Sequence, residues 1–227
     1  MAKLRILQLD TGFPRPAGDI ASADSYLQPP IIEIIPQAFV RDIVSIRPDN
    51  YDISGFTDAL QRSTEPLIIT SCGFMIYWQD MLADSTYLSA QSQFFSSSLI
   101  ALPELRMRYD DNQILVVSFD AQVLNSALYR PYLGSFQGPV MGLDTDSHLY
   151  QTIHQNSPQL NVELATGQVI DQMVPFLQEN DIHAILLECT NLSVYKPAIR
   201  KIFSGEIIDL LQIVESHITG LVKPAYL

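Results

Sequence analysis

Short apolar runs alternate along the chain with longer amphipathic stretches. The apolar runs are four to six residues long and rich in β-branched residues, as in strands that are covered on both faces. Such alternation is typical of α/β proteins, in which helices cover a parallel sheet. The strands predicted in this way are Arg5–Leu9, Ile31–Ile35, Leu67–Thr70, Ile114–Phe119, Val140–Leu143, Ala184–Leu187 and Ile207–Leu210, and Phe94–Phe95 is expected to be a further strand entering the core.

Between these runs, apolar residues recur every three or four positions and would share one face of a helix. Val162, Ala165, Val169, Met173 and Leu177 are one such series. The predicted helices are Ser54–Ser63, Phe74–Leu82, Ser97–Leu105, Ala121–Leu128, Thr145–His154, Pro158–Gln178, Val194–Phe203 and Gln212–Gly220.

The ends of the strands indicate an internal repeat. A strand ending in Asp10 is followed 62 residues later by Cys72, and a strand ending in Asp120 is followed 69 residues later by Cys189. We therefore expect an α/β fold of two pseudo-symmetric lobes, each a short, mostly parallel sheet flanked by helices. The predicted first lobe comprises residues 1–110 with 206–227, and the second comprises residues 111–205.

The segment Gly12–Pro30 interrupts the alternation. It contains four of the chain's prolines and is expected to be a long ordered loop. Long loops in compact domains are usually functional. Arg15 and Asp19 in this loop are expected either to cap a cleft or to form an ion pair within the loop, which would contribute little to stability.

Composition narrows the possible partners. The 227 residues are 47% hydrophobic, enough for one large domain or two small lobes, and the formal net charge is −12. Nucleic acids and anionic membranes require clustered Lys and Arg, so neither is expected as a partner. Any carboxylate ligand must be held locally, by backbone N–H groups and hydroxyls, against this acidic field. No apolar stretch approaches the roughly 20 residues of a membrane span.

The chain has two cysteines and no evident export signal, which favours reduced thiols and a cytoplasmic location. Its four histidines are dispersed, and no metal-binding spacing is present. No Gly-rich phosphate loop is present either, so neither a metal nor a cofactor is expected. A monomer and a homodimer are both compatible with the sequence.

Each cysteine follows a predicted strand and precedes a predicted helix. Ligands of open parallel sheets bind at this edge, where a helix N-terminus also lowers the pKa of a thiol. A free cysteine is often only a small buried hydrophobe. Two cysteines in equivalent turns, flanked by Ser71, Gly73 and Thr190, favour a functional pair.

These residues carry a family resemblance. The segments ITSCGF (69–74) and LLECTNL (186–192), with LDTGFPRPAGD (9–19) after the first strand, are similar to the aspartate/glutamate racemase superfamily. The resemblance implies an active site in the cleft between two lobes and cofactor-independent racemisation of an amino acid or related α-carboxylate. One cysteine would remove the Cα proton as a thiolate, and the other would return a proton to the opposite face. It implies the catalytic residues Cys72, Cys189 and Asp10.

The resemblance also implies substrate contacts from Thr11, Gly73, Phe74, Thr190, Asn191 and Arg15. Two positions depart from glutamate racemases: Gly73–Phe74 replaces an Asn–Thr pair, and Asn191 replaces a histidine. Asn191 can donate a hydrogen bond but cannot carry a proton at neutral pH. Glu188 could tune the Cys189 thiol, although strand alternation should point it away.

Other functions remain open at this stage. The same scaffold supports hydantoin racemases and maleate isomerases, and a carboxylate-binding protein without turnover would keep the same cleft. A structural protein with inert cysteines is the remaining alternative. A small-molecule carboxylate is the expected ligand of the racemase, of a maleate isomerase and of the binding protein.

Overall fold

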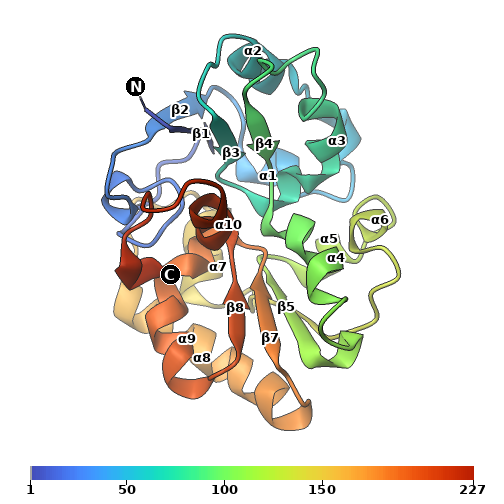
Figure 1. Ribbon diagram of the computed structural model, residues 1–227. Coiled ribbons are helices and arrows are strands. Elements are labelled where there is room, and N and C mark those ends of the chain that lie inside the picture. The colour runs from blue at the N-terminus through green and yellow to red at the C-terminus, as the bar shows by residue number, and fades with distance from the viewer. Residues whose placement is uncertain (1) are drawn as a thin grey trace.

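The computed structural model describes residues 2–227 and contains two four-stranded parallel sheets (Figure 1). The first sheet has the order β2-β1-β3-β4, and the second has the order β6-β5-β7-β8. The predicted α/β fold of two pseudo-symmetric lobes is confirmed, because the second sheet repeats the strand order of the first. The strands are β1 (Leu4–Leu9), β2 (Ile31–Ile35), β3 (Leu67–Thr70), β4 (Gln93–Phe95), β5 (Ile114–Ser118), β6 (Val140–Gly142), β7 (Ala184–Leu187) and β8 (Glu206–Ile208).

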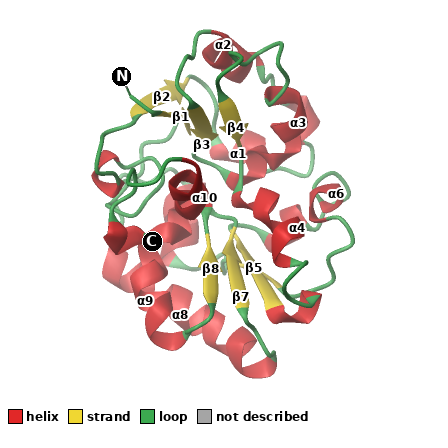
Figure 2. Cartoon of the chain, viewed as in Figure 1, coloured by secondary structure: helices red, strands yellow, loops and turns green. Residues whose placement is uncertain are grey.

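Helices surround both sheets (Figure 2). They are α1 (Val40–Ile43), α2 (Ser54–Gln61), α3 (Gln79–Leu82), α4 (Leu102–Leu105), α5 (Ala121–Leu124), α6 (Arg130–Leu133), α7 (His148–His154), α8 (Val162–Glu179), α9 (Lys196–Ile202) and α10 (Leu210–His217). In the part of the chain that is described, no helix is long and apolar enough to cross a membrane.

Several predicted boundaries are wrong for local reasons. Asn161 begins α8, because its side chain accepts a hydrogen bond from the Leu164 amide, so the helix excludes Pro158. Asp209 accepts a hydrogen bond from the Gln212 amide and begins α10, which ends the predicted strand 207–210 at Ile208. The predicted helix 74–82 begins as a 3-10 helix, Gly73–Trp78, before α3.

The C-terminal strand belongs to the second lobe, so its predicted place in the first lobe is wrong. β8 pairs in parallel with β7, with Ile207 opposite Ile185, just as β4 pairs with β3. Helix α10, with the tail that follows it, returns to the first lobe (Figure 1). Its residues Leu210, Leu211, Ile213 and Val214 are in one apolar cluster with Leu4, Ile6, Leu67 and Ile69 of the first sheet.

The segment after β4 makes the reciprocal crossing. Ser98 lies in a 3-10 helix, Ser98–Ala101, and its hydroxyl donates to the Leu187 carbonyl at 2.7 Å. Leu99 and Leu102 are buried in the large core cluster that also includes β7 residues. Each sheet is therefore followed by a helical segment that packs against the other lobe, and the two lobes share one core.

Candidate active site

Cys72 and Cys189 line the same pocket between the lobes. Cys72 follows β3 and precedes the 3-10 helix Gly73–Trp78, and Cys189 follows β7 and precedes a matching 3-10 helix, Thr190–Tyr195. β3 and β7 occupy equivalent positions in their sheets, so the repeat brings the two turns together. The pocket, with its mouth, has a volume of about 340 Å³.

The pocket has apolar walls and a few polar groups. Its apolar residues are Leu9, Phe13, Val40, Val44, Phe74, Phe119 and Ile153. Its polar residues, besides the two cysteines, are Arg15, Ser71, Glu188, Thr190 and Asn191, and Gly73 completes the lining. Seven of the nine predicted site residues therefore line this pocket, and Asp10 and Thr11 do not.

Hydrogen bonds join the two cysteine-bearing turns at this pocket. The Thr190 hydroxyl donates to the Ser71 carbonyl at 2.7 Å, from one lobe to the other. The Ser71 hydroxyl accepts from the Leu9 amide at 3.0 Å, which ties the turn to β1. Thr190 therefore holds the lobes together beside both thiols, and its hydroxyl proton is already used.

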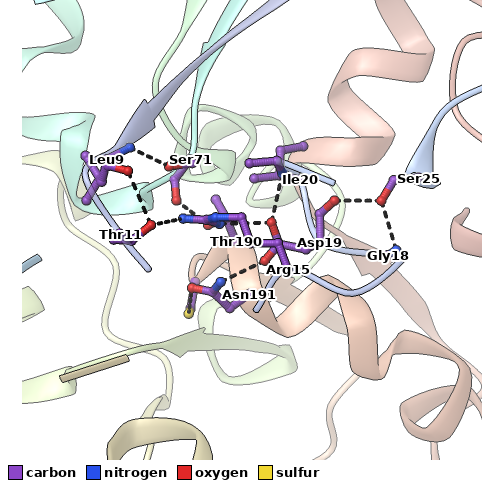
Figure 3. A network of polar contacts seen from close by, with 12 residues as sticks. Leu9, Thr11, Arg15, Gly18, Asp19, Ile20, Ser25, Ser71, Thr190 and Asn191 are labelled. Carbon is purple, nitrogen blue, oxygen red and sulfur yellow. Dashed lines mark hydrogen bonds and ion pairs between the residues drawn. The ribbon is translucent and has the colours of Figure 1, made fainter. Parts of the chain in front are cut away.

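The long loop is held against the site by Asp19, which is 1% exposed (Figure 3). Its Oδ1 accepts from Arg15 Nη1 at 2.9 Å, and its Oδ2 accepts from Asn191 Nδ2 at 2.7 Å. Asn191 is also next to Cys189, with 3.9 Å between Oδ1 and Sγ. The loop thus contains the Arg15–Asp19 ion pair, and Arg15 of this pair also lines the pocket.

Arg15 brings a positive charge to the pocket. Its Nη2 donates to Thr11 Oγ1 at 3.0 Å, so Thr11 acts by holding Arg15 and not by lining the pocket. Within residues 2–227, the buried Arg15 Nε has no hydrogen-bond partner. A guanidinium with a free N–H is a strong donor to a carboxylate.

Asp10 is placed elsewhere. Its carboxylate accepts from the Gln37 amide at 3.0 Å, and Gln37 has a φ of 62°, a conformation that few non-glycine residues adopt. Asp10 lines a neighbouring hollow with His154 and Asn156. The structure therefore gives Asp10 a turn-stabilising contact and does not bring it to the thiol pocket.

Glu188 lines the pocket, although strand alternation predicts that it points away from Cys189. The amides of both Glu188 and Cys189 point to the Val117 carbonyl, at 2.8 and 3.4 Å, so the alternation stops where β7 ends. Glu188 is fully buried, and its Oε2 accepts from the Ser118 hydroxyl at 2.8 Å. A carboxylate inside the apolar run AILLECT was the available signal, because unpaired charges are rarely buried without a function.

Burial is the largest influence on the pKa values of Cys72, Cys189 and Glu188. It raises the pKa of Cys72 to about 12, with a further increase from the Glu188 charge, and the amides of Phe74 and Met75 and the charge of Arg15 oppose it. Burial and Glu188 also raise the Cys189 pKa well above its ordinary value. Burial raises the Glu188 pKa to about 7, against hydrogen bonds from Ser118 and the Phe119 amide. At neutral pH both thiols are therefore protonated, and the pKa of Glu188 is raised toward neutrality.

No three His, Cys, Asp or Glu residues lie close enough to hold a metal ion in the described part of the chain.

No family model matches the sequence. A dimethylsulfoniopropionate lyase from Durusdinium sp. clade D is 24% identical over 240 residues, which is 97% of this chain and 75% of that protein.

Solved structures identify the fold. An aspartate racemase of Picrophilus torridus superposes with a TM-score of 0.55 at 12% identity, covering 99% of this chain and 98% of the racemase. An arylmalonate decarboxylase superposes with a TM-score of 0.58 at 13% identity, covering 98% and 96%. The chain has the two-lobed fold of these enzymes, and the resemblance noted in its sequence is confirmed at the level of the fold.

Proposed function

We propose that the chain is a cofactor-independent racemase or epimerase of an amino acid or related α-carboxylate. Cys72 and Cys189 would exchange the Cα proton on opposite faces of the substrate. The supporting observation is the convergence of two thiols, from equivalent turns of two repeated lobes, on one pocket. Two acid–base groups are needed because one alone would tend to return the proton to the face that it left.

The carboxylate of the substrate would bind Arg15. A Cα–H bond is only weakly acidic, so the negative charge that develops on the carboxylate must be stabilised by a preorganised donor. The Nε–H of Arg15, which has no hydrogen-bond partner among residues 2–227, is such a donor. Asp19 and Thr11 hold the guanidinium in place. The local cation also offsets the repulsion expected from the chain's net charge of −12.

The remainder of the pocket favours an uncharged substituent. Phe13, Phe74, Phe119 and Ile153 form much of its wall. Among the described residues that line it, Arg15 is the one cation. A second carboxylate on the substrate would therefore be desolvated without a partner, which is costly. A monocarboxylate with an apolar or neutral side chain is the better fit.

Elimination is a second candidate, favoured by the likeness to the dimethylsulfoniopropionate lyase across 97% of the chain. In such a reaction one thiolate would take the proton next to the carboxylate. The electron pair would form a carbon–carbon double bond as a leaving group departs from the next carbon. Racemisation and elimination share the first proton transfer and differ in whether Cβ carries a leaving group.

Proton NMR in D2O tests both candidates. The protein would be incubated with single-enantiomer amino acids with apolar, neutral and acidic side chains, hydantoins, maleate and dimethylsulfoniopropionate. Loss of a Cα–H signal without new alkene signals supports racemisation, and new alkene signals with release of a leaving group support elimination. Ligand-induced thermal stabilisation without any exchange would contradict both and leave carboxylate binding as the function.

A further inference from the structure

The two thiols need a base, and none of the other residues that the family resemblance implies for the site can act as one. With both thiol pKa values raised by burial, a resting thiolate is scarce at neutral pH. Asp10, which the family resemblance implies to be catalytic, accepts a hydrogen bond from Gln37 outside the pocket. The Asn191 side chain is an amide and cannot accept a proton at neutral pH. A different group must therefore accept the thiol proton if the proposed reaction is to run.

Glu188 is next to both cysteine-bearing turns. It precedes Cys189 in the chain, and across the lobe boundary it packs against Gly73, the residue after Cys72. A Cβ built on Gly73 would be only 2.3 Å from Glu188 Oε1, so the carboxyl group abuts this turn. Glu188 and both cysteines line the same pocket.

One oxygen of Glu188 is held and the other is free. Oε2 accepts from the Ser118 hydroxyl of β5, which fixes the orientation of the group. Oε1 is buried and has no hydrogen-bond partner within residues 2–227. A buried unsatisfied carboxyl oxygen costs free energy, so its retention beside two thiols is best explained by a use in the reaction.

We propose that Glu188 is the proton acceptor that converts a thiol of the Cys72–Cys189 pair into the thiolate, an inference that rests on the proposed two-thiol chemistry. The proton of one thiol moves to the Glu188 carboxylate, leaving a thiolate and a neutral carboxyl group. That thiolate takes the Cα proton, and the second thiol gives its proton to the other face. Glu188 then returns its proton to the second sulfur, so the three groups again hold two protons.

The surroundings of Glu188 suit this exchange. Four ionisable groups surround it: Cys72, Cys189 and Arg15, which line the same pocket, and Tyr129, on whose pKa its charge acts. Tyr129 stays neutral, because burial raises its pKa and its hydroxyl donates to the Ile43 carbonyl at 2.7 Å. When Glu188 takes the proton, its charge disappears, and with it the repulsion that adds to the effect of burial in raising both thiol pKa values.

The test is the pH dependence of Cys72 alkylation by iodoacetamide, followed by residue-resolved mass spectrometry from about pH 5 to about pH 9. In the wild type, proton sharing with Glu188 makes the rate rise until about pH 7 and then flatten, because from there on the three groups hold two protons and the thiolate share stays constant. In Glu188→Gln the rate should rise about tenfold per pH unit through neutrality without flattening. Glu163→Gln, an exposed change of the same charge, should keep the wild-type curve.

A second variant guards against misfolding of Glu188→Gln. Ser118→Ala removes a hydrogen bond that lowers the Glu188 pKa, so the bend should move to higher pH. A wild type without a bend, a bend retained in Glu188→Gln, or a bend unmoved by Ser118→Ala would each overturn the proposal. The bend requires no substrate. Its presence without turnover would refute only the proposed reaction, and its absence with turnover would refute only the role of Glu188.

Discussion

Glu188 is a fully buried carboxyl group that binds its proton more tightly in the folded chain than in the unfolded one, because its pKa rises from 4.5 to about 7. Its stabilising contribution is complete below about pH 4.5 and is lost as the pH rises through about 7. Between about pH 5 and pH 8, the wild type should therefore lose about 2–3 kcal/mol of unfolding free energy relative to Glu188→Gln. Urea unfolding at both pH values measures this difference, and parallel behaviour of the two proteins would contradict it.

Arg15 is the residue on which carboxylate affinity should depend. Arg15→Lys keeps a cation beside Asp19 but removes the free Nε–H. We expect the apparent substrate constant to rise about tenfold or more, because a charge-assisted hydrogen bond contributes about 1.5–3 kcal/mol. Arg41→Lys, which alters a side chain that is 74% exposed, is the matched control. An equal constant in the two variants would assign Arg15 to the structure of the loop alone.

At the residue scale, the sequence predicts what its local pattern encodes. Cys72 and Cys189 are predictable because strand ends and the repeat place them at one edge. Asp10 lies at the same edge, but its side chain accepts a hydrogen bond from the amide of Gln37, which has a positive φ. The spacing of residues in the sequence does not reveal this turn. Glu188 faces the pocket because two successive amides share the Val117 carbonyl, an irregularity without a sequence signature.

Among the elements, the two lobes are packed tightly against each other at Gly73. A Cβ there would lie 2.2 Å from the Glu188 carbonyl oxygen, and a backbone atom cannot rotate away. Gly73→Ala should therefore cost about 1–3 kcal/mol of stability and misplace both thiols.

Gly167 offers the matched control, because a Cβ there meets no atom within 4 Å. It lies inside α8, where alanine should stabilise the helix by about 0.5–1 kcal/mol. Thermal melts of the two variants should shift in opposite directions. Similar shifts would show that the lobes can separate at Gly73 without loss.

Element boundaries follow the same division between local and tertiary signals. α8 is predictable because its apolar series spans several turns, and its true start follows from the Asn161 cap. The one-turn helices α1 and α6 are too short for a periodic pattern and depend on their surroundings.

For the molecule as a whole, the reciprocal crossings of α4 and α10 should couple the unfolding of the two lobes. Trp78, the only tryptophan in the chain, is buried in the first lobe, whereas far-UV circular dichroism reports on both lobes. The two signals should change in one coincident thermal transition. A Trp78 transition separate from the circular dichroism transition would show that the lobes unfold independently.

The two-lobed plan is predictable from the repeated strand endings, but the crossings are not. β8 pairs with β7 just as β4 pairs with β3, so the repeat includes a fourth strand in each sheet. The predicted lobe boundary places this strand in the wrong lobe. That α10 then packs on Leu4 and Ile6 depends on shape complementarity between distant segments. No local pattern encodes it.

The most direct measurement is the loss of the Cα–H signal from each pure enantiomer of a turned-over substrate in D2O, for the wild type, Cys72→Ser and Cys189→Ser. Two thiols acting from opposite faces predict that the wild type converts either enantiomer to a deuterated racemate. Each serine variant should keep its fold and fail to racemise, because a serine hydroxyl is a far weaker acid than a thiol. Racemisation at the wild-type rate in either variant would contradict the two-thiol account.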